Sequence, residues 1–261
     1  MVYIARYGEI GTKGKNRIFF ERKLIENIRL QLVKHKKIFE KIKRVRGRIL
    51  VYSDEDLGIL RYVFGMVSFS KAVETDLDIE EIKKNALKLY KGKKFRITAS
   101  RLEKKFLSSK EINQIIGEFI VKKKNGKVDL KKPDQEIFIE IFNDKAYIFD
   151  KKVKCLGGLP IGVSGRVGII LENEDSMISA YLMMKRGCNV VFIKKNNIDL
   201  KDLENVYPHR IEIFDKVPEN IEVIVSGVLK KYKDKIVFNP IYGYSEEKIK
   251  EIKKLLHEPH A

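Results

Sequence analysis

The chain has 261 residues, with 54 lysines and arginines against 36 aspartates and glutamates, for a formal net charge of +18. Its hydrophobic content of 44% is sufficient for ordinary cores and argues against global disorder. The length predicts two or three small domains. No apolar run approaches the ~18–20 residues of a membrane span and the N-terminus has no signal-peptide pattern, so we expect a cytoplasmic protein with no membrane partner.

The basic excess is confined to one part of the chain. Residues 1–158 carry a net charge of +17, whereas residues 159–261 carry +1. Adaptation to heat is an alternative explanation, but it raises the fractions of lysine and glutamate together. Here lysine is in excess over glutamate, and only in one part of the chain. We therefore expect a polyanion, in particular nucleic acid, to bind the first 158 residues.

The first predicted module is a small α+β unit over residues 1–56. A strand at residues 2–6 is followed by a helix over Phe19–Val33, whose apolar residues recur at helical spacing, and then by a strand pair within residues 38–52. Between the first strand and the helix lies a glycine-containing loop with Lys13, Lys15 and Arg17. Such a loop suits phosphate contact, although a plain solvated turn is an equal alternative.

The second predicted module, residues 57–156, alternates helices with strands. Its predicted helices cover residues 57–64, 78–89 and 110–121, and its predicted strands cover residues 68–73, 95–101, 137–141 and 145–149. Asp78 is the expected N-cap of the second helix. Residues 122–127 form a predicted basic turn, and Asn143-Asp144 joins an antiparallel strand pair.

The loop after the strand at 95–101 combines cations with an aromatic residue. Arg101, Lys104 and Lys105 precede Phe106. Cations and an aromatic ring suit the phosphates and unstacked bases of RNA. For Phe106 itself, packing into the core is the favoured interpretation.

The third predicted module, residues 157–261, has the pattern of a doubly wound parallel sheet. A glycine-rich segment, Gly157–Gly165, predicts a hinge into this module. A strand at 167–171, the loop 172–176 and a helix at 177–185 follow, in the order in which α/β proteins hold phosphates. Further predicted strands cover residues 189–193, 210–214, 221–225 and 237–238, and the last predicted helix runs from Ser245 to Leu256.

Several motifs together make the chain resemble the tRNA 4-thiouridine synthetases (tRNA sulfurtransferases). The motifs are Tyr7-Gly8-Glu9-Ile10 with Lys13–Arg17, Ser68–Val73, Phe95-Arg96-Ile97, Lys127–Leu130, Gly157–Gly162 and Ala180–Gly187. The resemblance implies an N-terminal ferredoxin-like domain (1–56), a THUMP RNA-binding domain (57–156) and a C-terminal PP-loop pyrophosphatase-like domain (157–261).

The same resemblance implies a partner and contact residues. Family members bind the acceptor end of tRNA and form homodimers, so we expect both here. The RNA contacts that it implies are Lys13, Lys15, Arg17, Arg101, Lys104 and Lys105, with Lys131 and Lys132 as weaker candidates. For each of these cations, a solvated side chain without an RNA role is the alternative.

The family's phosphate loop, Ser-Gly-Gly-x-Asp-Ser, is degenerate in this chain. Asp175 and Ser176 match its last two positions, but Glu172-Asn173-Glu174 replaces four residues with three and removes both glycines. A carboxylate about 4 Å from a phosphate charge costs about 4 kcal/mol at an effective dielectric constant of ~20. We therefore expect no cofactor, with ATP and magnesium binding only if this degenerate loop still accepts them.

The sulfur chemistry also lacks its expected cysteine. Cys155 and Cys188 have no metal-ligand spacing and are expected to be ordinary reduced thiols. Neither matches the family's late catalytic cysteine, and we expect no added rhodanese-like domain. We thus predict no catalytic residue and no metal site.

Three functions stay open at this point. The first is a tRNA-binding THUMP protein that lacks ATP-dependent catalysis. The second is a tRNA sulfurtransferase of 4-thiouridine and thiazole biosynthesis, either active by itself or helped by a sulfur-carrier or modification-enzyme partner that supplies the cysteine. The third is a structural or regulatory dimeric subunit of an RNA-modification complex.

Overall fold

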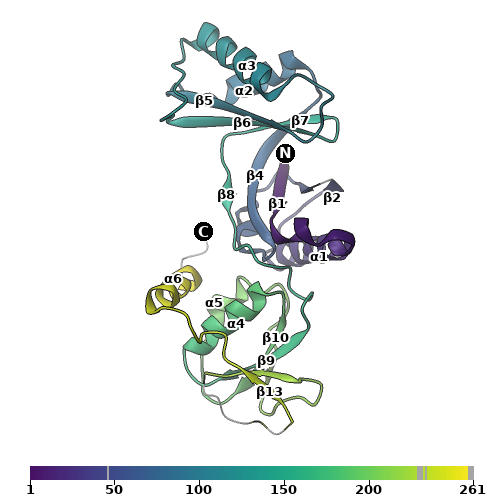
Figure 1. Ribbon diagram of the computed structural model, residues 1–261, viewed down its shortest axis with the longest axis vertical. Helices are drawn as coiled ribbons and strands as arrows, with labels where there is room; N and C mark the ends of the chain where they lie inside the picture. The colour runs from purple at the N-terminus through teal and green to yellow at the C-terminus, as the bar shows by residue number, and fades with distance from the viewer. Residues whose placement is uncertain (46, 228–231, 233, 258–261) are drawn as a thin grey trace. The chain divides into compact units, whose positions relative to one another are not determined.

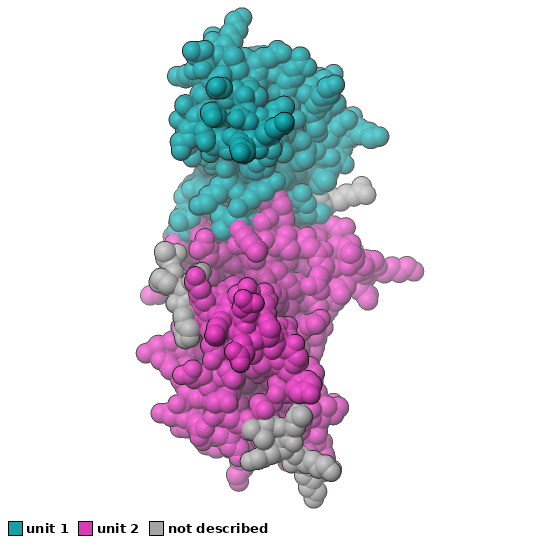
Figure 2. Space-filling model, turned by 60° about the vertical axis from the view of Figure 1, so that its left-hand side comes forward, with its two compact units in different colours: residues 1–5, 39–56, 69–153 teal, residues 6–38, 57–68, 154–261 magenta. Residues whose placement is uncertain are grey.

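The computed structural model describes residues 1–45, 47–227, 232 and 234–257. The chain divides into two compact units, each assembled from separate segments of the sequence (Figure 2). Unit 1 contains residues 1–5, 39–56 and 69–153, and unit 2 contains residues 6–38, 57–68 and 154–261. Within the described part of the chain, no helix is both long enough and apolar enough to cross a membrane.

The main element of unit 1 is a mixed β-sheet. Its strands are β1 (Val2–Tyr7), β2 (Lys41–Val45), β3 (Arg48–Tyr52), β4 (Met66–Thr75), β5 (Phe95–Arg101), β6 (Gln135–Phe142), β7 (Lys145–Phe149) and β8 (Val153–Lys154). Their order is β2-β3-β1-β4-β7-β6-β5, with β8 paired to β4. The pair β5–β6 is parallel, so its connection must cross over the sheet. Helix α3 (Ser109–Lys124) lies in that crossover.

Two helices, α2 (Ile79–Leu89) and α3, cover the same face of strands β5 to β7 (Figure 1). Their buried isoleucines pack against isoleucines of the strands in one continuous core. Asp78 caps α2, as predicted, by accepting the backbone N–H of Glu80. Ser108 and Glu111 form a reciprocal capping box at the start of α3. These caps fix where both helices begin.

The predicted antiparallel pair at Asn143-Asp144 is confirmed by the pairing of β6 with β7. Asn143 and Asp144 have φ angles of 52° and 55°. Two successive residues with positive φ make the tight hairpin turn whose twist matches that of the strands, and Asn and Asp tolerate this conformation.

Unit 2 contains a parallel five-stranded sheet, which confirms the predicted fold of the third module. Its strands are β9 (Arg166–Leu171), β10 (Asn189–Lys194), β11 (Ile213–Phe214), β12 (Val223–Val225) and β13 (Ile236–Phe238), in the order β11-β10-β9-β12-β13. The helices that follow the first strand are α4 (Asp175–Lys185), α5 (Lys201–Glu204) and α6 (Glu246–His257). Every residue of α4 from Ser176 to Met184 is buried, so this helix is the centre of the unit's core.

The segment Gly157–Gly165 was expected to be a hinge, but its backbone is fixed within unit 2. The N–H groups of Gly162, Val163 and Ser164 all donate to the carbonyl of Gly187, at 2.8–3.1 Å. At Gly158, φ is 73°, and a Cβ atom would lie 2.2 Å from the carbonyl oxygen of Lys185. Glycine is therefore required at this position for close packing rather than for mobility.

Helix α1 (Arg17–Lys34) belongs to unit 2 although it follows the first strand in sequence. The side chain of Asn27 donates to the carbonyl of Ile161 at 3.2 Å, and the ammonium of Lys34 donates to that of Tyr207 at 2.9 Å. Gln31 also donates to the carbonyl of Asn205. Polar contacts thus attach α1 to the segments around the parallel sheet.

Several predicted elements differ from the structure. The predicted helix at 57–64 is a single 3-10 helix, Gly58–Tyr62, because Val63 is already extended and Gly65 has a φ of 94°. The predicted basic turn begins too early: Lys122–Lys124 continue α3, where lysines complement the negative end of the helix dipole. Residues 210–212 lie outside β11, which begins at Ile213.

Candidate functional site

The predicted basic loop at the N-terminus is two consecutive 3-10 turns, Glu9–Thr12 and Gly14–Asn16, leading into α1. Lys15 is exposed. Lys13 is half-buried, with its ammonium nitrogen 5.2 Å from the centroid of the Phe20 ring. Both lysines remain accessible to a phosphate, since a cation over an aromatic face keeps its outer side in solvent.

Arg17 lies in an internal polar network. Its Nε donates to Glu21 Oε1 at 2.8 Å, and an Nη donates to the hydroxyl of Tyr7 at 2.7 Å. The Tyr7 hydroxyl in turn donates to Glu21. Burial first, and then the hydrogen bond to Glu21, raise the pKa of Tyr7 to about 12. Arg17 therefore balances a buried carboxylate and has fewer donors left for RNA. The spacing of four residues from Arg17 to Glu21 was a readable sign of this ion pair.

The cations after β5 have different roles. Arg101 donates to the carbonyl oxygens of Phe106 and Leu107 at 3.0 and 3.4 Å, so it holds its own loop in place. Phe106 packs against the core of unit 1, as favoured from the sequence. Lys104 and Lys105 are exposed.

Lys105 lies beside acidic side chains. Its ammonium nitrogen is 3.0 Å from Asp144 Oδ1 and 3.9 Å from Glu103 Oε2. The hydrogen bond to Asp144, followed by the charges of Asp144 and Glu103, raises the pKa of Lys105. Exposed ion pairs of this kind contribute little to stability, so a phosphate group could exchange with Asp144 at low cost.

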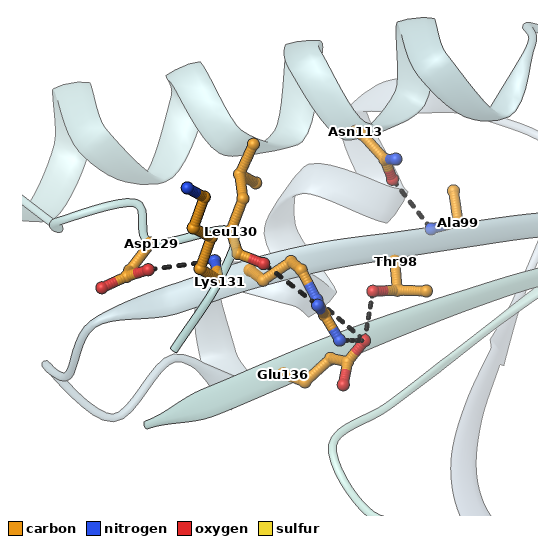
Figure 3. A network of polar contacts seen from close by, with 8 residues as sticks. Thr98, Ala99, Asn113, Asp129, Leu130, Lys131 and Glu136 are labelled. Atoms are coloured by element: carbon orange, nitrogen blue, oxygen red, sulfur yellow. Dashed lines mark hydrogen bonds and ion pairs between the residues drawn. The ribbon is translucent and has the colours of Figure 1, made fainter. Parts of the chain in front are cut away.

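Lys131 and Lys132 lie in a loop with a fixed backbone, and Figure 3 shows Lys131 beside Asp129. Asp129 Oδ1 accepts the backbone N–H groups of both lysines, at 3.0 and 2.9 Å. Arg96 donates to the carbonyl of Leu130 at 3.1 Å and to Glu136 Oε1 at 2.6 Å, which fastens the loop to strands β5 and β6. The two ammonium groups remain exposed.

The two lysine pairs of unit 1 are not brought together. Phe95 pairs with Gln135 at one end of β5, and Arg101 pairs with Ile141 at the other. Lys104 and Lys105 follow one end, and Lys131 and Lys132 precede Gln135 at the opposite end. Seven residues at about 3.3 Å each separate the pairs by roughly 20 Å. An RNA that contacts both pairs must follow the length of the strands.

In the loop between β9 and α4, the backbone is closed by the loop's own side chains. The Ser176 hydroxyl accepts the N–H groups of Glu172 and Asn173 at 3.1 and 3.4 Å. Asn173 Oδ1 accepts the N–H of Asp175 at 3.0 Å, and the Asn173 carbonyl accepts that of Ser176, also at 3.0 Å. Four N–H groups at the positive end of α4 are therefore already satisfied.

The carboxylates of this loop form a hydrogen bond or ion pairs with residues far along the sequence. Glu172 Oε2 accepts the hydroxyl of Ser226, just after β12, at 2.9 Å. Lys253 of α6 lies 3.1 Å from Asp175 Oδ1 and 4.0 Å from Glu174 Oε2. Sequence reasoning missed Ser226 and Lys253, because each lies dozens of residues from the loop and carries no local motif.

Neither cysteine lies in a disulfide; Cys155 is half-buried and Cys188 is buried. Burial raises the pKa of the Cys188 thiol, which disfavours the reactive thiolate. Across the described ranges, no group of three or more His, Cys, Asp or Glu side chains could hold a metal ion.

Two family models match the chain. The model of the ThiI ferredoxin-like domain matches residues 2–70, and that of the THUMP domain matches residues 77–150. Neither range ends at residue 56 or 156, so the domain boundaries placed there stay predictions.

Similar proteins are tRNA sulfurtransferases by name. A probable tRNA sulfurtransferase of Thermococcus kodakarensis is 39% identical over 280 residues, which cover 100% of this chain and 68% of the relative. One of Mycoplasmopsis synoviae is 40% identical over 73% of this chain and 50% of its own length. One of Thermoanaerobacter sp. is 33% identical over 90% of this chain and 70% of its own length. The chain thus spans 50–70% of these curated relatives.

Two solved structures share the fold. PH1313 from Pyrococcus horikoshii has a TM-score of 0.86 and 34% identity, covering 98% of this chain and 99% of that one. A 4-thiouridine synthetase in complex with RNA and bound ATP has a TM-score of 0.77 and 25% identity, covering 99% of this chain and 87% of that one.

Proposed function

This chain belongs to the tRNA sulfurtransferase family, and from that premise we propose that it binds tRNA but does not bind ATP through the loop 172–176. The THUMP domain and the RNA complex of a similar synthetase support an RNA ligand. The net charge of +17 in the first 158 residues supports it as well.

The closed backbone of the loop 172–176 is the observation that carries the second half of the proposal. A phosphate would have to displace the Ser176 hydroxyl and the Asn173 side chain from the N–H groups that they bond. It would also approach the carboxylates of Glu172, Glu174 and Asp175, each at a cost of about 4 kcal/mol near 4 Å and a dielectric constant of ~20.

Magnesium fits this loop no better, because the ammonium of Lys253 already lies 3.1 Å from Asp175. The residues of the loop 172–176 therefore do not fit ATP with its metal ion. The acceptor end of tRNA as the bound region, homodimer formation and an added sulfur-carrier partner stay predictions from the family.

Exchange of Lys104 and Lys105 for alanine tests the RNA half of the proposal. Both lysines are exposed, so folding should be unaffected. Each lost phosphate contact should reduce the slope of log affinity against log salt by about 1. The measurement is tRNA binding by fluorescence anisotropy at several salt concentrations.

The matched control is Lys84→Ala/Lys88→Ala on helix α2, which likewise removes two exposed lysines of unit 1, with Lys84 ion-paired as Lys105 is. We expect the control to bind tRNA like the unmodified protein. Equal affinity and equal salt slope in both double variants would remove Lys104 and Lys105 from the interface. If the unmodified protein fails to bind tRNA, the proposed function is wrong.

A further inference from the structure

Unit 2 contains a cavity of about 710 Å³, which we call the α4–α6 cavity. Its walls come from the C-terminal end of α4, one side of α6, the residues around Cys155 and the turn after β13. The loop 172–176 adjoins the opposite end of α4, which is 11 residues long. The lining on α4 begins at Tyr181, five residues or about 7.5 Å along the helix from Ser176, and the lining residues include none of the loop 172–176.

Cations outnumber acids on the cavity's walls. The lining cations are Lys154, Lys185, Arg186 and Lys248, and the lining acids are Glu9 and Glu251. Lys248 donates to Glu251 Oε2 at 2.5 Å. The lining therefore retains an excess of positive charge that a bound anion would neutralise.

Lys185 is the most confined of these cations. Burial first, and then the charge of Lys248, lower its pKa, while Glu9 raises it and Lys154 lowers it further. Its neighbours therefore disfavour its charged form unless an anion is present. A phosphate within reach of Lys185, Lys154 and Lys248 would remove this mutual repulsion.

Aromatic rings accompany the cations. Phe238 and Tyr244 line the cavity and remain substantially exposed, and the ammonium of Lys185 lies 5.8 Å from the centroid of the Tyr181 ring. Cations for the backbone and open ring faces for the base are the elements by which proteins hold unpaired nucleotides. The volume is within the range of small-ligand sites.

We propose that the α4–α6 cavity binds an unpaired nucleotide of RNA, with its phosphate at Lys154, Lys185 and Lys248 and its base against Phe238 or Tyr244. This inference rests on the proposed function, because the nucleotide belongs to an RNA that the protein binds. It assigns to unit 2 an RNA contact that does not use the loop 172–176.

Cys155 provides a built-in reporter, because it lines the cavity and is half-buried, whereas Cys188 is buried elsewhere in unit 2. The full chain is treated with N-ethylmaleimide, and the alkylation rates of its two cysteines are followed by mass spectrometry. The probes are a tetra-adenylate RNA, adenosine monophosphate and inorganic phosphate. We expect the RNA to slow alkylation of Cys155, and not of Cys188, at a concentration at least tenfold lower than either small probe requires.

Charge reversal identifies the site. Lys154→Glu/Lys248→Glu changes two exposed lining residues, and Lys250→Glu/Lys254→Glu makes the same charge change on exposed residues of α6 outside the lining. Anisotropy of labelled tetra-adenylate gives a second measurement that does not depend on the thiol. The first variant should bind at least tenfold more weakly, and the second within twofold of the unmodified protein.

Equal affinity in the two variants would overturn the proposal, as would undiminished alkylation of a reactive Cys155 at saturating RNA. Equal protection by adenosine monophosphate would overturn the assignment to RNA. Whole-tRNA binding by the unmodified protein separates the two claims. If tRNA binds while the tetranucleotide tests fail, only the cavity inference falls; if tRNA does not bind, the proposed function falls with it.

Discussion

Ser176 illustrates how a residue of a phosphate loop can take a structural role. Its hydroxyl accepts two backbone N–H groups of the preceding loop, and its side chain is buried. Those N–H groups have the position that a phosphate would need at the start of α4. The same serine that matches the family's motif therefore helps to close the loop.

Substitution Ser176→Ala should destabilise the protein, because it removes the hydroxyl acceptor of the Asn173 N–H and one of the acceptors of the Glu172 N–H. The expected loss in free energy of unfolding is about 1–2 kcal/mol, measured by denaturant titration. Ser100→Ala, at an exposed position of β5, is the control and should change the free energy by less than about 0.5 kcal/mol. A stability loss no larger than the control's would contradict the role assigned to Ser176.

Tyr7 makes stability depend on alkaline pH. Because its folded-state pKa is raised to about 12 from 10.0, the folded state holds this proton more tightly than the unfolded state. Its contribution is complete below the unfolded pKa and is lost as pH rises through the window from 10 to 12. In Tyr7→Phe the melting temperature should therefore fall less steeply across that window.

The control for this pH series is Tyr242→Phe, since Tyr242 is 85% exposed. Melting curves at several pH values compare the two variants with the unmodified protein. We expect only Tyr7→Phe to change the slope. Identical slopes in all three proteins would mean that burial and the contact with Glu21 do not hold the Tyr7 proton in the folded state.

At the scale of elements, helix α1 belongs to the first module predicted from the sequence, yet in the structure it is part of unit 2, which contains the parallel sheet. Asn27, Gln31 and Lys34 all donate to carbonyl groups of residues in 161–207. Breaking the buried contact of Asn27 leaves polar groups without partners, so α1 should open together with unit 2.

Hydrogen exchange tests this grouping of α1. We expect the amides near Leu24 and Ile28 to exchange at denaturant concentrations that open β9 and β10, rather than at those that open β5 to β7. Mass spectrometry of peptides from a denaturant series gives the comparison. If α1 opens together with β5 to β7 while unit 2 stays closed, the assignment of α1 to unit 2 is wrong.

Local signals explain which elements the sequence predicted well. Helix α2 begins where Asp78 supplies a cap, and the β6–β7 turn lies at Asn143-Asp144, whose side chains tolerate positive φ. Long-range pairings have no such signal: β9 pairs with β12 although β10 and β11 lie between them in the sequence. The partners of Glu172 and Asp175 were unpredictable for the same reason, since Ser226 and Lys253 reach the loop only through the fold.

Among the predicted RNA contacts, charge and local composition identified exposed cations but not their internal partners. Lys15, Lys104, Lys131 and Lys132 are exposed as expected. Arg17 and Arg101, by contrast, donate to groups within the protein. A sequence shows that a cation is present, whereas its neighbours in three dimensions decide how many of its donors remain for RNA.

At the scale of the whole molecule, the two ends of helix α4 differ in what they offer a ligand. The chain belongs to the tRNA sulfurtransferase family, yet the loop at the start of α4 is closed by its own side chains. At the other end of α4 lies a cavity lined by cations and aromatic rings. We therefore propose that the protein binds RNA and that its loop 172–176 does not bind ATP.

Calorimetric titration of the full chain with ATP and magnesium tests this account most directly, with tRNA titrated into the same preparation as the positive control. The account predicts that tRNA binds while ATP gives no binding heat, or a dissociation constant weaker than about 1 mM, equivalent to about −4 kcal/mol. A micromolar affinity for ATP that is lost on substitution of Asp175 or Ser176 would contradict it.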